Sequence, residues 1–100
     1  MQRPINEREK EWIRSVLEQE SRNSGLHPEP YLSQIDDLIV VEECDCGDPG
    51  CFSVRFSGYE PGHSFGLADG TVQLENGKSV MVIVFIHGDT RRISEIETID

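Results

Sequence analysis

The sequence predicts an α+β domain in which one N-terminal helix packs on a four- to five-stranded antiparallel meander. Apolar residues near the N-terminus recur with helical spacing, and this pattern stops at a glycine. The rest of the chain alternates short apolar and β-branched runs with turn sequences. A length of 100 residues with 36% hydrophobic content suits a single domain over residues 1–100.

The helix is predicted from about Glu7 to Asn23. Asn6 can cap its first turn, and Glu9, three residues later, completes a capping box. Gly25 provides the stop, because glycine readily adopts the positive φ at which many helices end. The apolar stripe that would face the sheet consists of Trp12, Ile13, Val16 and Leu17.

A connector over residues 27–37 contains two prolines and has room for one helical turn that starts at Pro30. The predicted strands cover residues 38–43, 52–57, 65–74, 80–86 and 92–99. In the third strand, the Asp-Gly pair at residues 69–70 predicts a bulge. The Asn-Gly pair at residues 76–77 predicts a tight hairpin to the next strand. The last segment is favoured as a strand because isoleucine and threonine dominate it.

The strand over residues 80–86 is apolar on both faces, which predicts an interior strand covered on both sides. The helix would cover one face. The other face would need cover from the connector, from strand curvature or from a second subunit. Left open, it would be a site for a partner.

All three cysteines, Cys44, Cys46 and Cys51, lie around one predicted turn. Residues 48–50, Asp-Pro-Gly, have turn chemistry, so Cys46 and Cys51 would face each other across a hairpin loop. Cys44 would lie on the same face as Cys46 in a regular strand. Three interpretations stay open: reduced cysteines that pack as small apolar residues, thiolate ligands of zinc or another soft metal, and a disulfide or redox pair.

The zinc interpretation needs a fourth ligand, because structural zinc sites are usually four-coordinate and no second cysteine pair exists here. The candidate metal set is the three cysteines with His63, which folding could bring near Cys51. The alternatives for the fourth position are His87, His27, a carboxylate or a group from another subunit. No other cofactor is expected.

Residues 62–66 match Gly-x-Ser-x-Gly, the nucleophile elbow of α/β-hydrolases, with Ser64 in the nucleophile position. Asp69 and His87 follow in the required order of acid and base. However, the elbow needs a strand-to-helix turn above a parallel sheet, whereas a strand pattern follows here. We therefore interpret the match as coincidence, and no catalytic residue is predicted.

A net charge of -10 argues against a nucleic-acid-binding surface, because phosphate contacts need clustered Lys and Arg. The acidic excess favours solubility, and we interpret it as a solvated acidic surface rather than a dedicated electrostatic interface, with a basic partner as an additional role. No signal peptide is expected from the first ten residues, and the longest apolar run, residues 80–86, is too short to span a bilayer. An odd number of cysteines then suggests the reducing cytoplasm.

The order of motifs resembles a family of small bacterial proteins of unknown function. The shared features are an N-terminal helix, a strand that ends in a Cys-x-Cys-Gly turn, and a β-meander. The matching segments are residues 40–41, 44–47, 52–54, 82–86, 88–89 and 93–96. In those relatives a third cysteine follows the glycine closely, whereas three residues intervene before Cys51 here. The resemblance implies a fold and no known activity.

The sequence thus predicts a small, cytosolic, non-enzymatic module that works by contact with a protein partner or as a homodimer. The alternative is a zinc-binding or thiol-redox-responsive protein that uses Cys44, Cys46 and Cys51.

Overall fold

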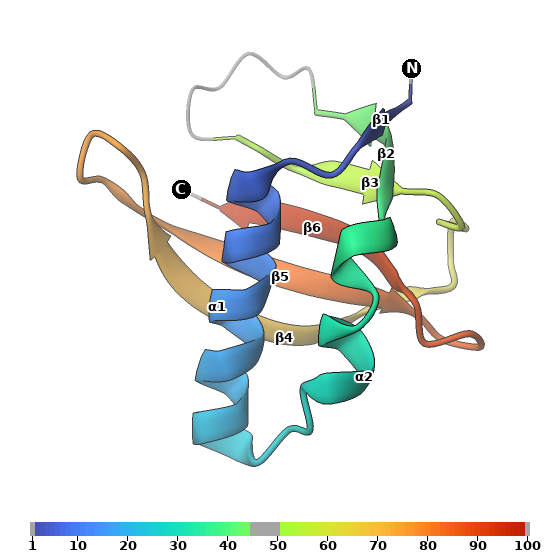
Figure 1. The fold of residues 1–100 in the computed structure, drawn as a ribbon, viewed down its shortest axis with the longest axis horizontal. Coiled ribbons are helices and arrows are strands. Elements are labelled where there is room, and N and C mark those ends of the chain that lie inside the picture. The colour runs from blue at the N-terminus through green and yellow to red at the C-terminus, as the bar shows by residue number, and fades with distance from the viewer. Residues whose placement is uncertain (1, 45–50, 100) are drawn as a thin grey trace.

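The computed structural model, which describes residues 2–44 and 51–99, has a helical layer on one face of a six-stranded antiparallel sheet (Figure 1). The predicted α+β class is therefore confirmed. The helices are α1 (Glu7–Ser24), α2 (Glu29–Leu32) and the 3-10 helix η1 (Ile35–Asp37). The strands are β1 (Arg3–Pro4), β2 (Ile39–Glu43), β3 (Val54–Phe56), β4 (Ser64–Gln73), β5 (Ser79–His87) and β6 (Ile93–Ile99).

The strand order is β1-β2-β3-β6-β5-β4, which differs from the predicted meander. The strands β4, β5 and β6 do form a meander, but β3 pairs with β6, with Arg55 opposite Glu95. The chain therefore crosses from β3 to the far edge of the sheet before the meander returns. The predicted count of four to five strands is also wrong, because β1 adds a two-residue strand, with Arg3 opposite Val40.

The β4–β5 hairpin forms around the predicted Asn-Gly pair, but its loop covers residues 75–77 rather than that pair alone. Gly77 has φ 83°, and the Leu74 amide donates to the Lys78 carbonyl at 2.7 Å. The β4 bulge lies between Gly66 and Ala68, so its predicted place at residues 69–70 is wrong. The Asp-Gly pair there continues the regular ladder.

The capping box of α1 is formed as predicted. The Glu9 amide donates to Asn6 Oδ1 at 2.8 Å, and the Asn6 amide donates to Glu9 Oε1 at 3.0 Å. The helix ends one residue later than predicted, and Gly25 follows it with φ 78°. No helix in the described part of the chain is both long and apolar enough to cross a membrane.

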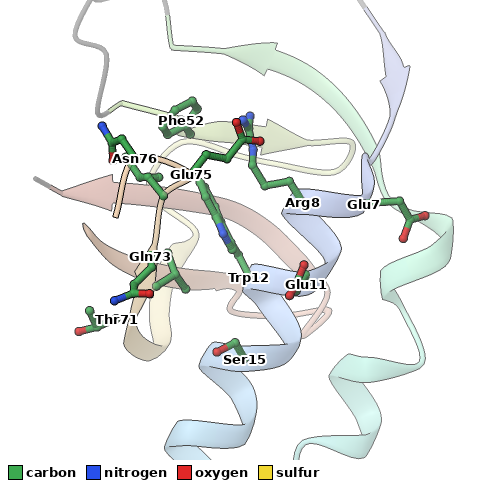
Figure 2. Close-up of a pocket in the computed structure, with 12 residues that line it drawn as sticks. Glu7, Arg8, Glu11, Trp12, Ser15, Phe52, Thr71, Gln73, Glu75 and Asn76 are labelled. Carbon is green, nitrogen blue, oxygen red and sulfur yellow. The ribbon is translucent and has the colours of Figure 1, made fainter. Parts of the chain in front are cut away.

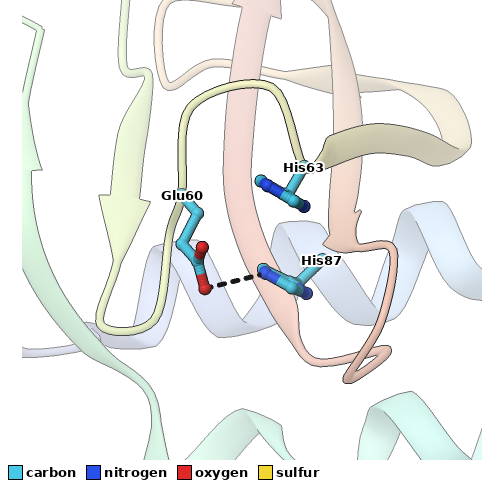
Figure 3. Close-up of side chains that lie close together, drawn as sticks. All are labelled: Glu60, His63 and His87. Carbon is cyan, nitrogen blue, oxygen red and sulfur yellow. Dashed lines mark hydrogen bonds and ion pairs between the residues drawn. The ribbon is translucent and has the colours of Figure 1, made fainter.

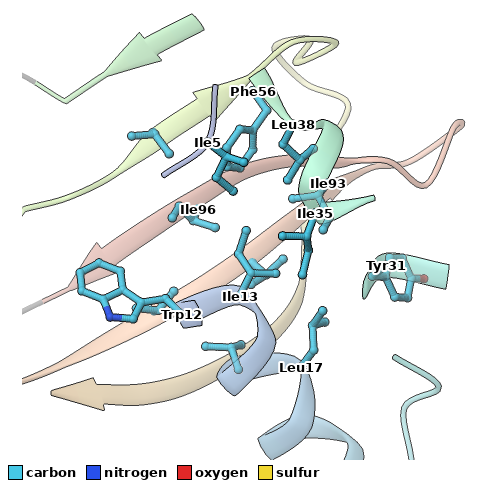
Figure 4. Close-up of a cluster of buried hydrophobic side chains, with 14 of the residues drawn as sticks. Ile5, Trp12, Ile13, Leu17, Tyr31, Ile35, Leu38, Phe56, Ile93 and Ile96 are labelled. Atoms are coloured by element: carbon cyan, nitrogen blue, oxygen red, sulfur yellow. The ribbon is translucent and has the colours of Figure 1, made fainter. Parts of the chain in front are cut away.

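The core lies between α1, the connector and the inner face of the sheet (Figure 4). The stripe of α1 supplies Trp12, Ile13, Val16 and Leu17, all buried as predicted. The connector closes one end of this core with Tyr31, Ile35 and Leu38. From the sheet, Phe56 is the largest side chain that is completely buried. The described helices α1, α2 and η1 therefore all pack on the inner face of the sheet. We call the opposite face of the sheet its outer face.

Gln19 of α1 binds the exposed edge of β4. Its side-chain Nε2 donates to the Thr71 carbonyl at 3.1 Å, and the Thr71 amide donates back to Oε1 at 3.2 Å. Gly70 leaves the room for this contact, because a Cβ there would lie 2.6 Å from Gln19 Oε1. One glycine thus allows a side-chain amide to take the place of a neighbouring strand.

Gly70→Ala is expected to lower the free energy of unfolding by about 1 kcal/mol, measured by urea denaturation. The added methyl group would push the flexible Gln19 side chain aside, so the loss is that of its two hydrogen bonds to Thr71. Gly66→Ala is the matched control on the same strand, since its Cβ would meet Ile83 at an ordinary 3.6 Å. Equal losses in the two variants would contradict this account.

Candidate functional site

Three apolar side chains, Met81, Ile83 and Phe85, lie on the outer face of β5. We call these three residues the apolar stripe. Alternation along the strand sends the intervening residues into the core and these three away from the helices. Met81 is 38% exposed, and Ile83 and Phe85 are half-buried. In the part of the chain that the structure describes, α1, α2 and η1 all lie on the other face (Figure 1), so neither a helix nor the connector covers this one. Cover by a second subunit stays a prediction.

Neighbouring strands extend and border this stripe. Ile99 of β6 lies opposite Met81 and is 42% exposed, which enlarges the apolar surface. Asp69 of β4 and Glu97 of β6 both lie opposite Ile83, one on each side. Both carboxylates are exposed, and no cationic side chain among the described residues lies within ion-pair distance of either. The centre of the face is thus an apolar residue between two carboxylates that lack a cation.

A third carboxylate on this face is neutralised. Glu95 of β6 lies opposite Phe85 and accepts from Arg55 Nε at 3.3 Å. Arg55 also contacts Glu42 at 3.3 Å, and its guanidinium lies 4.4 Å from the centre of the Tyr59 ring. The hydrogen bond to Glu95 raises the pKa of Arg55 above its ordinary value, although burial opposes this. Arg55 is therefore already bound by groups of its own chain.

A cluster of Glu60, His63 and His87 lies where β5 ends (Figure 3). The ligand atoms of the three side chains lie within 4.8 Å of one another, a separation at which they could approach one metal ion. The two imidazole rings stack in nearly parallel planes with centroids 5.4 Å apart. His87 is buried, whereas His63 and Glu60 are exposed.

The hydrogen bonds of His87 fix its tautomer. Its Nδ1 accepts from the backbone amides of Asp89 at 3.1 Å and Thr90 at 3.3 Å. Because a neutral imidazole carries one N–H, the proton lies on Nε2, which donates to Glu60 Oε1 at 3.1 Å. In this tautomer Nε2 offers no lone pair to a metal, so the geometry favours a turn-stabilising role for His87.

His87→Ala is expected to lower the free energy of unfolding by about 1–3 kcal/mol, because two turn amides lose their acceptor. Urea denaturation followed by circular dichroism measures the change. His63→Ala is the control, since its side chain is 51% exposed, and it should change stability by about 0.5 kcal/mol or less. An equal cost for both would indicate that the stacked pair, rather than the turn, carries the stability.

Cys44 and Cys51 lie at a different end of the sheet from this cluster. Cys44 follows β2 and Cys51 precedes β3, and the Cys44 amide donates to the Ser53 carbonyl at 2.9 Å. Cys46 lies outside the described residues. His63, the predicted fourth ligand, joins Glu60 and His87 instead.

The other predicted fourth ligands are likewise placed elsewhere. His27 lines a separate groove beside Tyr31 and Arg91, and both ring nitrogens of His87 are engaged by its turn and by Glu60. The structure thus supplies no histidine to Cys51 from the described residues.

The residues of the Gly-x-Ser-x-Gly match also have other partners. Ser64 Oγ lies 2.9 Å from Ser94 Oγ, and Ser64 begins strand β4 rather than a helix. His87 directs both ring nitrogens elsewhere, and Asp69 lies on the outer face opposite Ile83. These contacts do not form a nucleophile–base–acid chain.

A groove of about 840 Å³ lies between the first turns of α1 and the β4–β5 hairpin (Figure 2). Its floor is Trp12 and Phe52, which meet edge to face with centroids 5.5 Å apart. The Arg8 guanidinium lies 4.3 Å from the centre of the Phe52 ring and 5.2 Å from that of Trp12. The guanidinium thus covers the aromatic floor of this groove.

Sequence patterns gave uneven signals for these residues. The apolar run over residues 80–86 places apolar side chains on both faces of a strand, and the apolar stripe is the set on the outer face. Nothing in the sequence indicates the pairing of Glu60 with His87, because Glu60 lies in an irregular turn 27 residues away.

Comparison of the chain with protein-family models, with curated proteins and with solved structures gave no match. The resemblance to small bacterial proteins of unknown function therefore stays an expectation. Function has to be inferred from the residues of this chain.

Proposed function

We propose that this chain is a small, cytosolic, non-enzymatic module that binds a protein partner on the outer face of its sheet. The observation that carries the proposal is the apolar stripe, which lies on an interior strand and which no other described element covers. Together with Ile99 it offers contiguous apolar side chains on a surface that is otherwise acidic. Contiguous exposed apolar surface of this kind usually marks an interaction site.

A site-specific photo-crosslinker tests this proposal. Met81 is replaced by p-benzoylphenylalanine in cells, which places the reactive group on the stripe, and Glu18, exposed on α1, is replaced in a matched control. We expect Met81 to give a defined crosslinked protein that Glu18 does not give. Identical products from both positions, or none from Met81, would count against a docking face.

A homodimer is the alternative occupant of the same surface. Light scattering on a dilute sample separates the two cases, because a homodimer would have twice the 11.3 kDa mass of one chain. A clean monomer would count against the homodimer and leave a different protein as the partner.

A second candidate function is soft-metal or thiol-redox chemistry at the cysteine turn. It is supported by the placement of Cys44 just after β2 and Cys51 shortly before β3, and Cys46 lies between them in the sequence. Elemental analysis of protein purified without added metal, with thiol titration, tests it. Stoichiometric zinc would support this candidate, whereas three freely titrating thiols without zinc would remove it.

A further inference from the structure

We infer that the partner that binds the apolar stripe is cationic: a protein segment with an apolar ridge bordered by Lys or Arg. This inference rests on the proposed function and names the chemistry of the partner. It follows from the two carboxylates that border Ile83, Asp69 and Glu97.

Register fixes the distance between the apolar and acidic groups. Residues directly opposite on adjacent antiparallel strands have Cβ atoms about 4.5–5.5 Å apart. An apolar side chain seated on Ile83 would therefore bring its own neighbours over Asp69 on one side and Glu97 on the other. Removing two carboxylates from water without a cation is costly, so a neutral or acidic partner would bind poorly there.

A second copy of this chain fits the face less well than a cationic partner. Two copies face to face would bring four such carboxylates into one interface, from molecules that each carry a net charge of -10. Arg55, a cation of β3 on this face, is held by Glu95, Glu42 and the ring of Tyr59. A separate basic protein supplies the missing charge directly.

The length of the stripe indicates what shape of segment it accommodates. Met81 and Phe85 are four residues apart on one strand, which corresponds to about 13 Å. An amphipathic helix covers that distance with about nine residues. A short basic amphipathic helix is therefore a suitable probe of the face.

The experiment is an NMR titration of the ¹⁵N-labelled chain with three synthetic 18-residue peptides. The first is an amphipathic helix of leucine and lysine, the second replaces each lysine with glutamate, and the third replaces each leucine with serine but keeps the lysines. We expect the leucine–lysine peptide to shift the amides of Met81, Ile83 and Phe85 in a saturable way. The other two peptides are expected to leave these amides unchanged at the same concentration.

Matched variants then test whether the two carboxylates are responsible. Asp69→Asn combined with Glu97→Gln is expected to weaken binding of the leucine–lysine peptide by about tenfold. The control removes the same charge from the exposed surface of α1, with Glu11→Gln and Glu18→Gln, and is expected to leave the affinity unchanged. Equal weakening in the two double variants would overturn the inference. The loss of affinity would then follow from the change in net charge and not from the position of the two carboxylates beside the stripe.

The outcomes also separate this inference from the proposed function. Equal binding of the leucine–glutamate peptide on the stripe would overturn the cationic partner and keep the docking face. A dimer whose intermolecular NOEs come from the side chains of the stripe would do the same, with a second copy as the occupant. No peptide response together with no crosslink from Met81 would overturn both.

Discussion

Glu9→Ala is expected to lower the free energy of unfolding by about 3 kcal/mol. The Glu9 side chain is 1% exposed and accepts from Arg3 Nη1 at 2.9 Å and Nη2 at 2.8 Å. It also accepts from the Asn6 amide, so one carboxylate both caps α1 and holds β1. The hydrogen bond to Glu9 is the main reason that the pKa of Arg3 is raised. Removing Glu9 leaves the Asn6 amide without its acceptor and leaves the half-buried guanidinium of Arg3 with Glu43 as its remaining carboxylate.

Chemical denaturation measures this change, and two variants separate its parts. Glu9→Gln keeps an oxygen for the Asn6 amide but loses the charge, so it should cost less than Glu9→Ala. Glu11→Ala, at an exposed position of the same helix, should change stability by about 0.5 kcal/mol or less. A Glu9→Ala variant as stable as Glu11→Ala would show that the buried pair contributes nothing to folding.

Phe56→Ala is expected to lower the free energy of unfolding by about 3–5 kcal/mol. Phe56 is 0% exposed and lies in the core between the sheet and the connector, close to Ile5 and Leu38 (Figure 4). Removing its ring leaves a cavity that the surrounding strands can close only in part.

Phe65→Ala is the matched control, because Phe65 is 46% exposed at the start of β4. Its loss should cost about 1 kcal/mol or less. Thermal unfolding and urea denaturation of both variants provide the comparison. Equal costs would mean that Phe56 is not the principal filler of this part of the core.

The features predicted correctly from the sequence are those that depend on neighbouring residues. The capping box of Asn6 and Glu9, the glycine stop at Gly25 and the Asn-Gly hairpin each need only a few consecutive residues. The features that sequence patterns missed depend on distant pairing. Nothing in residues 54–56 indicates that β3 pairs with β6, and the two residues of β1 are too few to show alternation.

The same distinction applies to the candidate site. The apolar stripe follows from alternation within β5 alone, so the sequence indicates it. The border of Asp69 and Glu97 depends on the register of three strands, including the bulge at residues 66–68. His63 was predicted beside the cysteines, but the crossover from β3 to β4 carries it to Glu60 and His87 instead.

The amide of Gln19 has a consequence for self-assembly. At Thr71 it fills the backbone positions that an added strand would need, so β4 offers no uninterrupted ladder to another chain. Growth of the sheet into a fibre from this edge would first require α1 to release that side chain. Through Gln19, helix α1 therefore protects the β4 edge of the sheet from the addition of further strands. The same helix also forms one wall of the core.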